Sequence, residues 1–267
     1  MLLAADFDRD LTVAYQPTVL SGSHQICSFE ALVCWSSPEL GPVGPNEFIP
    51  IAERTDLIFE ISRRVLRRAL ADVAHWPGRI AVKINLSVRD LMSRPQAEWL
   101  LAELGRGTVA PNRITFEVTE TIFAESLDQV RAKIDLLRST GASIAIDDFG
   151  VGYSSLRYIH ALAPEIIKVD LCFVSASTHD PLAQRIIRTI VELARNVGAC
   201  SVAEGMETAA QADLLAELGC DELQGYVFSR PLSPEAALAL AREAAPASMP
   251  LAVAEGPVSR GPVAAIA

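Results

Sequence analysis

The stretch Ile114–Asp148 reads ITFEVTETIFAESLDQVRAKIDLLRSTGASIAIDD, and it contains the repeating unit that decides the fold. Its first part, Ile114–Val118, is apolar and β-branched, as is typical of a strand buried on both faces. Ser126 and Gln129 have the spacing of a capping box ahead of a helical pattern. A second apolar run, Ser143–Ile146, follows after a short connection. The stretch therefore predicts a strand, a crossover helix and a parallel strand.

The same alternation of short apolar runs and longer helical patterns continues along most of the chain. The runs expected to form strands are Leu11–Gln16, Ile26–Val33, Ile80–Asn85, Ile114–Val118, Ser143–Ile146, Ile166–Val169, Cys200–Ala203 and Glu222–Val227. About eight strands in a chain of 267 residues favour an α/β fold, a (β/α)₈ TIM-like barrel. A doubly wound sheet is the alternative, but it usually carries a glycine-rich phosphate turn, and the sequence has no GxGxxG pattern.

The first two runs differ from the others, because the short segment between them contains a turn-like Ser-Gly-Ser-His at 21–24. A connection this short predicts a hairpin, so we expect an antiparallel first strand in the barrel. The barrel should occupy residues 11–243, after an N-terminal lead-in of residues 1–10. Residues 244–267 are rich in Ala and Pro without periodicity, which predicts a flexible tail.

One helical pattern, Leu57–Val73, places its apolar residues on one face and a basic cluster on the opposite face. The cluster consists of Arg63, Arg64, Arg67 and Arg68. A solvated outer face is the favoured interpretation, and a docking site for a partner is the alternative.

The composition narrows the possible functions. Acidic residues number 33 against 23 basic ones, a net charge of −10, whereas proteins that bind nucleic-acid polymers usually carry a basic surface. The five cysteines are scattered and never in CxxC spacing, which is typical of reduced thiols in a cytosolic protein. The first residues lack a signal-peptide pattern, and no run of about 18 apolar residues occurs. We therefore expect a cytoplasmic protein with no membrane span and no nucleic-acid polymer as its partner.

Polar side chains interrupt the apolar runs at or near the ends of the predicted strands. They are Glu30, Asn85, Glu117, Asp147, Asp148 and Glu204. The carboxyl ends of parallel barrel strands meet at one mouth, so we expect these side chains to converge there. Five carboxylates packed together would repel one another and take up protons unless a cation lay among them. Oxygen ligands favour Mg²⁺, Mn²⁺ or Ca²⁺ over zinc, which prefers His or Cys.

Six oxygen ligands exceed what one Mg²⁺ usually takes from a protein, so we expect a pair of ions. The adjacent Asp147 and Asp148 can serve both ions, with one of them bridging. Two such ions clamp the attacking and leaving oxygens of a phosphoester displacement. Lys168 can then steady the attacking water or a developing negative charge, and Glu204 can act as the general base. Taken singly, each residue also has a structural explanation, as a helix cap or as one half of an ion pair.

Ordered motifs at these positions make the sequence similar to the EAL family of cyclic di-GMP phosphodiesterases, from about Tyr15 to Leu232. They include Glu30-Ala31-Leu32, the tripeptide that gives the family its name. The others are Tyr15-Gln16-Pro17, Phe48-Ile49-Pro50, Asn85-Leu86-Ser87, Glu117-Val118-Thr119-Glu120, Asp147-Asp148-Phe149-Gly150, Ile167-Lys168-Val169-Asp170, Ala203-Glu204-Gly205, and Gln224-Gly225-Tyr226 with Pro231. So many motifs in the family's order make the resemblance specific.

The resemblance implies hydrolysis of cyclic di-GMP to linear pGpG with two Mg²⁺ or Mn²⁺ ions, and Ca²⁺ is expected to inhibit. By the family pattern the metal ligands are Glu30, Asn85, Glu117, Asp147 and Asp148, and the catalytic residues are Glu204 and Lys168. The positions implied to bind substrate are Gln16, Leu32, Gln224 and Pro231. Glu120 corresponds to the residue that stabilises the loop Phe149–Ser155, and this loop after Asp148 implies a homodimer.

One departure from the family pattern bears on activity. The family usually has an arginine that contacts a substrate phosphate where this chain has Cys34, and a thiol cannot replace a bidentate, permanently charged guanidinium. Loss of a charge-assisted hydrogen bond of about 1.5–3 kcal/mol lowers affinity or rate by roughly ten- to a hundredfold. The alternatives are a non-catalytic cyclic di-GMP receptor and a protein-interaction module that binds no nucleotide. All the metal-ligand positions are kept, which favours the enzyme.

Overall fold

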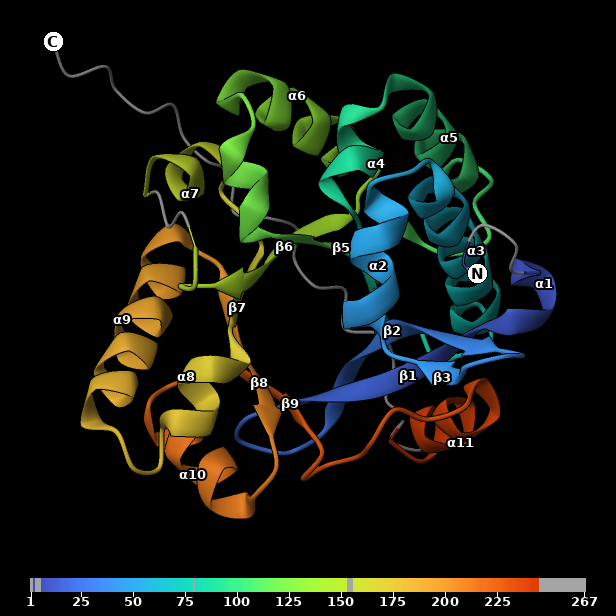
Figure 1. Ribbon diagram of the computed structural model, residues 1–267. Helices are drawn as coiled ribbons and strands as arrows, with labels where there is room; N and C mark the ends of the chain where they lie inside the picture. The colour runs from blue at the N-terminus through green and yellow to red at the C-terminus, as the bar shows by residue number, and fades with distance from the viewer. Residues whose placement is uncertain (1, 3–5, 79, 153–155, 245–267) are drawn as a thin grey trace, which may run out of the picture.

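The computed structural model describes residues 2, 6–78, 80–152 and 156–244 of the chain. Within these residues the strands are β1 (Leu11–Leu20), β2 (Ile26–Ser37), β3 (Gly41–Val43), β4 (Ala81–Asn85), β5 (Ile114–Thr119), β6 (Ser143–Phe149), β7 (Ile166–Val169), β8 (Cys200–Met206) and β9 (Glu222–Gly225). They form one sheet in the order β1-β9-β8-β7-β6-β5-β4-β2-β3, and a further pairing of β1 with β2 closes it into a barrel (Figure 1). The predicted (β/α)₈ TIM-like barrel is confirmed.

The barrel begins with the predicted antiparallel hairpin. β1 and β2 pair with Leu11 opposite Trp35 and Gln16 opposite Glu30. β1 is also antiparallel to β9, whereas β2 and β4 to β9 pair in parallel. The first strand therefore opposes the others that close the barrel. The short β3, which pairs antiparallel with the far end of β2, is an addition to the predicted set.

Five strands, β1, β2, β5, β6 and β8, extend past the ends that the sequence predicts. β6 continues through Asp147–Phe149 and β8 through Glu204–Met206, and both show register shifts in these extensions. The prediction ended β6 and β8 directly before their first carboxylates, Asp147 and Glu204. In the structure these carboxylates stay within the strands, because the barrel mouth that they reach is polar. The last strand, β9, ends at Gly225 and is shorter than predicted.

Helices cover the outside of the barrel (Figure 1). Within the described residues they are α1 (Phe7–Asp10), α2 (Pro45–Glu53), α3 (Leu57–Val73), α4 (Val88–Met92), α5 (Arg94–Leu104), α6 (Leu127–Arg138), α7 (Leu156–Leu162), α8 (Leu171–Ala176), α9 (Pro181–Val197), α10 (Ala209–Glu217) and α11 (Pro234–Ala244), with 3₁₀ helices η2 (Pro111–Arg113) and η3 (Glu120–Ala124). None of the helices described is long and apolar enough to cross a membrane. Of the tail predicted at 244–267, all but Ala244, the last residue of α11, lies outside the described residues.

Two predicted capping boxes have different outcomes. Thr208 and Gln211 form both hydrogen bonds of the box at the start of α10. The box predicted from Ser126 and Gln129 is wrong, because the Ser126 side chain makes no cap hydrogen bond. Ser126 still occupies the N-cap of α6, where its backbone carbonyl accepts from the Val130 N–H. The spacing thus located the helix start but not the contacts that stabilise it.

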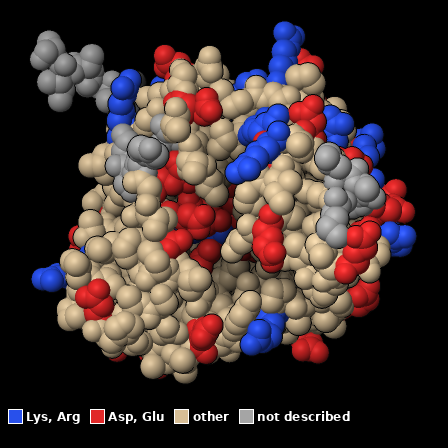
Figure 2. Space-filling view, viewed as in Figure 1, with Lys and Arg blue, Asp and Glu red and all other residues tan. Residues whose placement is uncertain are grey.

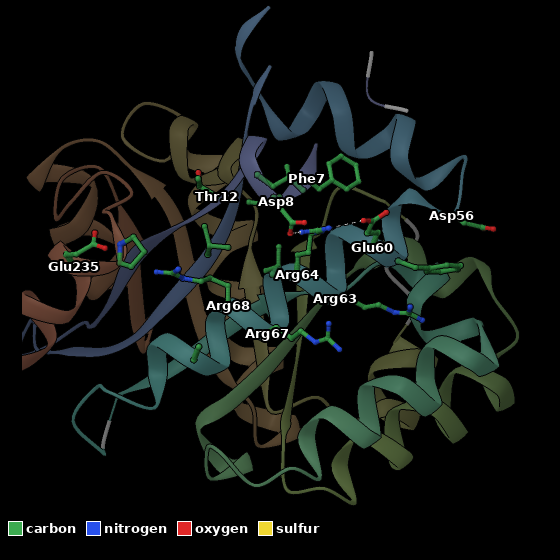
Figure 3. Close-up of a pocket in the computed structure, with 17 residues that line it drawn as sticks. Phe7, Asp8, Thr12, Asp56, Glu60, Arg63, Arg64, Arg67, Arg68 and Glu235 are labelled. Atoms are coloured by element: carbon green, nitrogen blue, oxygen red, sulfur yellow. Dashed lines mark hydrogen bonds and ion pairs between the residues drawn. The ribbon is translucent and has the colours of Figure 1, made fainter. Parts of the chain in front are cut away.

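The four arginines of α3 lie on its outer face beside a groove of about 1210 Å³, bounded by α1, β1 and the start of α11 (Figure 3). Arg63 donates to Gln96. The other three pair with acids: Arg64 with Asp8 and Glu60, Arg67 with Glu103, and Arg68 with Asp72. These exposed pairs compensate most of the basic charge. The arrangement agrees with a solvated outer face.

Alternate positions along each strand face two different environments. Ile84 and Phe116 belong to the apolar core and are at most 1% exposed. Lys83, Glu117 and Lys168 are equally buried, on the opposite face of their strands. The interior of such barrels is normally filled with apolar side chains, and a buried charge needs a partner. The charged interior therefore locates the candidate site.

Candidate active site

Lys168 on β7 lies at the centre of four carboxylates that come from four other strands. Its Nζ atom is 2.5 Å from Glu204 Oε1, 2.9 Å from Glu117 Oε1, 3.1 Å from Asp147 Oδ2 and 3.7 Å from Glu30 Oε2. The structure therefore brings together residues up to 174 positions apart in the sequence, at the mouth predicted from the strand ends. Figure 2 shows acidic side chains gathered in a central hollow of this face.

Glu30 on β2 is held by two side-chain amides. Asn85 Nδ2 donates to its Oε1 at 2.7 Å, and Gln224 Nε2 donates to its Oε2 at 2.6 Å. Burial raises the pKa of this carboxyl, but Lys168 and the two amides more than offset burial, so the pKa is lowered overall. Glu30 is therefore an ionised carboxylate with a fixed orientation.

Glu117 on β5 is in the opposite situation. Burial raises its pKa to about 8, and the neighbouring Glu30 and Asp147 add to the rise against the effect of Lys168. Neither of its oxygens has a hydrogen-bond partner within the described residues. Lys168 is at ion-pair distance, but its direction of approach does not satisfy a hydrogen bond. A buried carboxylate with two unpartnered oxygens is costly unless a cation binds there.

Three carboxylates at the mouth fit a metal ion. Glu30, Glu117 and Glu204 each offer an oxygen, and these three atoms lie within 4.8 Å of one another. Anions this close in a buried site repel unless a cation compensates them, and hard oxygen donors suit Mg²⁺ or Mn²⁺. This group includes Glu204, which the sequence predicted as the general base. It does not include Asp147, predicted as a ligand, although Asp147 shares the ion pair with Lys168.

Asp148 follows Asp147 in a left-handed conformation with φ of 53°. Its backbone N–H donates to Asp147 Oδ1 at 2.8 Å. Burial raises the pKa of the Asp148 carboxyl to about 6, and the charges of Asp147 and Asp170 add to the rise. The strained turn thus places two carboxylates side by side at the mouth.

Glu120 in η3 accepts hydrogen bonds from the loop that follows β6. Its Oε2 accepts from the N–H of Gly150 at 3.2 Å and of Gly152 at 2.9 Å. Gly150 has φ of 106°, and a Cβ there would lie 2.8 Å from the Phe173 ring, so the turn requires glycine. The predicted loop Phe149–Ser155 is described only as far as residue 152.

A cavity of about 310 Å³ opens beside the carboxylates. Its walls come from β2, from α2 and α3 and from the strand ends; they include Leu32, Asn46, Glu53, Asn85, Asp147 and Asp148. Leu32, predicted to bind substrate, is thus part of the cavity. Gln16 and Pro231 are not among its lining residues: the Gln16 amide donates to the Ser229 carbonyl, and Pro231 is exposed. The sequence signal for the α2 wall was the motif Phe48-Ile49-Pro50, to which no role was assigned.

Cys34 lies on β2 opposite Thr12 of β1, with its side chain exposed. Its Sγ contacts the Leu32 carbonyl at 3.8 Å, and burial of part of the side chain raises the pKa of the thiol. A neutral thiol at this position provides no charge for a phosphate.

Comparison with known proteins gives a consistent family match. The model of a family described as the EAL domain matches residues 3–231. Among curated relatives, the bifunctional diguanylate cyclase/cyclic di-GMP phosphodiesterase MucR of Pseudomonas aeruginosa is 36% identical over 235 residues, 86% of this chain and 34% of that protein. The cyclic di-GMP phosphodiesterase NbdA of the same organism is also 36% identical over 235 residues, covering 86% and 30%. The chain spans about a third of the length of such relatives.

Solved structures give the same result. The PaMucR phosphodiesterase in complex with c-di-GMP has a TM-score of 0.84 at 34% identity, over 89% of this chain and 98% of that one. The calcium/cyclic di-GMP complex of Klebsiella pneumoniae BlrP1 has a TM-score of 0.74 at 32% identity, over 84% and 56%. The match thus extends over the barrel and the elements that build its mouth.

Proposed function

The chain belongs to the EAL domain family, and on that premise we propose that it is a phosphodiesterase that hydrolyses cyclic di-GMP to linear pGpG. The observation that carries the proposal is the surplus of buried carboxylates at the mouth, four around one ammonium, beside a cavity that can admit a ligand. The names of MucR and NbdA, which are similar over most of this chain, support the substrate.

We propose that the mouth holds two Mg²⁺ or Mn²⁺ ions. The proposed ligands are Glu30, Asn85, Glu117, Asp147 and Asp148. Glu204 would lie beside the ion that Glu30 and Glu117 bind, because one oxygen of each of these three carboxylates lies within 4.8 Å of the others. When bound, such ions neutralise the charge of a phosphodiester and make water a stronger nucleophile. Both oxygens of Glu117 and Glu204 Oε1 support this assignment, because within the described residues they have an ion pair with Lys168 at most and no hydrogen-bond partner.

The protein's own groups would move and hold protons as follows. Glu204 accepts a proton from the attacking water, whose oxygen bonds to the phosphorus while the P–O bond to one ribose breaks. The departing ribose oxygen takes up a proton from solvent and leaves as a hydroxyl. Burial alone would lower the pKa of Lys168, but the charges of Asp147, Glu117 and Glu30 more than offset it, so the pKa is raised. Lys168 therefore remains an ammonium. It keeps a positive charge at a fixed place in the mouth and stabilises the negative charge that develops on the phosphate.

On the substrate side, Leu32 lies in the cavity wall. Gln224, Gln16 and Pro231 are the further positions proposed to bind or position the dinucleotide. With Cys34 in place of an arginine, we expect a phosphate to be held less tightly than in relatives that keep the charge. Weaker binding of the substrate phosphate lowers turnover at low substrate concentration, while the metal ligands are unchanged.

We also propose a homodimer that forms through the loop after Asp148. Val151 and Leu156, on either side of residues 153–155, are 57% and 68% exposed. Large exposed apolar side chains favour burial against a second surface. Sedimentation of the purified chain tests this, and a monomer at micromolar concentration would contradict it.

The deciding experiment incubates the purified protein with cyclic di-GMP and Mg²⁺ or Mn²⁺ and separates the products by chromatography. We expect pGpG with either ion and none with Ca²⁺. Glu30→Ala should reduce hydrolysis to background, whereas the exposed Glu39→Ala should not change it. Binding of cyclic di-GMP without product would favour a receptor. No thermal shift with cyclic di-GMP and Ca²⁺ would favour a protein-interaction module.

A further inference from the structure

A hydrogen-bonded chain runs through the barrel interior beneath the mouth and ends on Glu30. Lys83 Nζ on β4 donates to Thr18 Oγ1 on β1 at 3.4 Å. Thr18 Oγ1 donates to Gln224 Oε1 on β9 at 2.7 Å, and Gln224 Nε2 donates to Glu30 Oε2 at 2.6 Å. Thr18 and Gln224 are direct cross-strand partners. All four side chains are buried, so water does not compete for these bonds.

The chemistry of the two ends fixes the direction of every bond in this chain. A lysine ammonium has only donors, so Thr18 Oγ1 must accept from Lys83 and direct its single proton elsewhere. That proton goes to Gln224, and the atom that receives it must be the amide oxygen. At the other end, an ionised Glu30 only accepts, so the amide nitrogen of Gln224 must face it. The Gln224 orientation therefore follows from the network and not from an arbitrary choice of amide flip.

Lys83 is itself held in place. Its Nζ lies 3.2 Å from Glu222 Oε2, and Glu222 is two residues before Gln224 on β9. The same strand thus carries the anchor of the lysine and the amide that the lysine orients through Thr18. Loss of the Thr18 hydroxyl would leave the Gln224 oxygen without its donor, so that only the bond to Glu30 would still orient the amide.

We propose that Thr18 is a positioning residue. Lys83 donates to its hydroxyl, the hydroxyl donates to the Gln224 amide oxygen, and the amide so oriented holds Glu30 in place for a divalent cation. The inference rests on the proposed function, because it concerns the same mouth. Groups that orient a metal ligand typically change metal affinity or activity by about 10–100-fold when they are lost. The sequence offers no motif for this role, since Thr18 is an ordinary strand residue following Pro17.

The test measures Mn²⁺ binding to the full chain by calorimetry, without nucleotide, in Thr18→Val and Thr18→Ser. We expect the Mn²⁺ dissociation constant to rise by about 10–100-fold in Thr18→Val and to stay near the wild-type value in Thr18→Ser, which keeps the hydroxyl. In hydrolysis assays, saturating Mn²⁺ should restore most of kcat to Thr18→Val. A shift of the metal requirement with recovery of kcat is what orientation of a ligand predicts and what general damage to the barrel does not.

Thr115→Val is the matched control. Thr115 lies on β5 opposite Lys83, is buried, and has no side-chain hydrogen bond within the described residues. It should bind Mn²⁺ as the wild type does. Equal Mn²⁺ affinity in Thr18→Val and wild type would overturn the inference, as would equal losses in Thr18→Val and Thr115→Val.

Two further outcomes separate this inference from the proposed function. If the wild type binds Mn²⁺ and hydrolyses cyclic di-GMP while Thr18→Val is unchanged, only the role of Thr18 falls. If the wild type binds no Mn²⁺, both proposals fall together. Should Thr18→Val fail to fold, Lys83→Met combined with Glu222→Met removes the donor end without leaving a buried charge. That variant should weaken Mn²⁺ binding to a smaller extent, and unchanged binding would overturn the inference.

Discussion

The barrel interior holds two buried lysines in very different surroundings. At the mouth, Lys168 faces four carboxylates, and both oxygens of Glu117 lack a hydrogen-bond partner within the described residues. In the layer beneath, Lys83 faces one carboxylate, Glu222, and the hydroxyl of Thr18. The lower layer is complete in itself, whereas the mouth has an excess of negative charge that the protein alone does not compensate.

The difference shows which feature of a polar interior indicates function. Both layers contain buried charges in strands that are otherwise apolar, so the presence of charge distinguishes nothing. What distinguishes the mouth is its surplus of negative charge, together with carboxylate oxygens that have no hydrogen-bond partner within the described residues. The proposed cation site is therefore the one beside Lys168 and not one beside Lys83, although the two lysines are equally buried.

The largest effect should come from Lys168→Met. Removal of the one ammonium leaves the carboxylates of the mouth facing one another, which should abolish hydrolysis and cost about 3–5 kcal/mol in the free energy of unfolding. Lys83→Met should cost less, because its partner Glu222 retains some solvent contact, with 16% of its side chain exposed. Urea unfolding at pH 7 measures both, and equal losses would remove the contrast between the two layers.

Mn²⁺ should restore part of the stability of Lys168→Met, because a divalent ion can replace the missing charge. No such rescue is expected for Lys83→Met. A rescue of both variants to the same extent would mean that the ion does not act at the mouth.

The next effect concerns Glu117→Gln, which should remove metal-dependent hydrolysis but change metal-free stability in a pH-dependent way. The pKa of Glu117 is raised from 4.5 to about 8 in the folded protein, first by burial. In this window the folded state binds the extra proton, so the stability of the wild type should fall as pH rises from about 4.5 to 8. Glu117→Gln lacks this titration, so its advantage in melting temperature should grow with pH. Melting curves that remain parallel from pH 5 to 8 would contradict the assignment.

A smaller and opposite effect is expected of Cys34→Arg, which adds a charge on β2, four residues beyond Glu30, without changing either layer. A guanidinium there should bind a substrate phosphate and lower KM, or raise kcat/KM, by roughly ten- to a hundredfold. Cys34→Ser is the control, since it changes the thiol without adding charge. Steady-state kinetics with Mn²⁺ check the result, and a neutral or harmful effect of the arginine would mean that another residue already holds the phosphate.

The convergence at the mouth could be predicted from the sequence because parallel strands bring their carboxyl ends to one place. Glu30 and Glu204 are far apart in the chain, yet each ends or interrupts an apolar run. The hairpin of β1 and β2 was equally accessible, because the nine residues between Gln16 and Ile26 are too few for a crossover. Both predictions rest on geometry that the backbone imposes on any sequence of this pattern.

The lower layer could not be predicted in the same way. Lys83 and Glu222 are 139 residues apart, and each stands within a predicted strand without a flanking signal. Which face of a strand a lone polar residue occupies depends on the register, and a shift of one residue reverses it. The roles of Asp147 and Glu204 could not be distinguished from the sequence for a similar reason. The sequence predicts that the carboxylates converge, but the distances between their oxygens depend on the folded strands.

The smallest effect should come from replacing the lower ion pair as a whole. Lys83→Met with Glu222→Met exchanges two buried charges for apolar side chains of similar length, and such exchanges are often neutral or stabilising by about 1–4 kcal/mol. We therefore expect the free energy of unfolding of the double variant to equal or exceed that of the wild type, whereas each single variant should be less stable. Hydrolysis at saturating Mn²⁺ should remain, because the four carboxylates and Lys168 are untouched. Urea unfolding of the two single variants and the double variant forms a complete cycle. A double variant less stable than Lys83→Met would show that the lower layer depends on its charges as strongly as the mouth does.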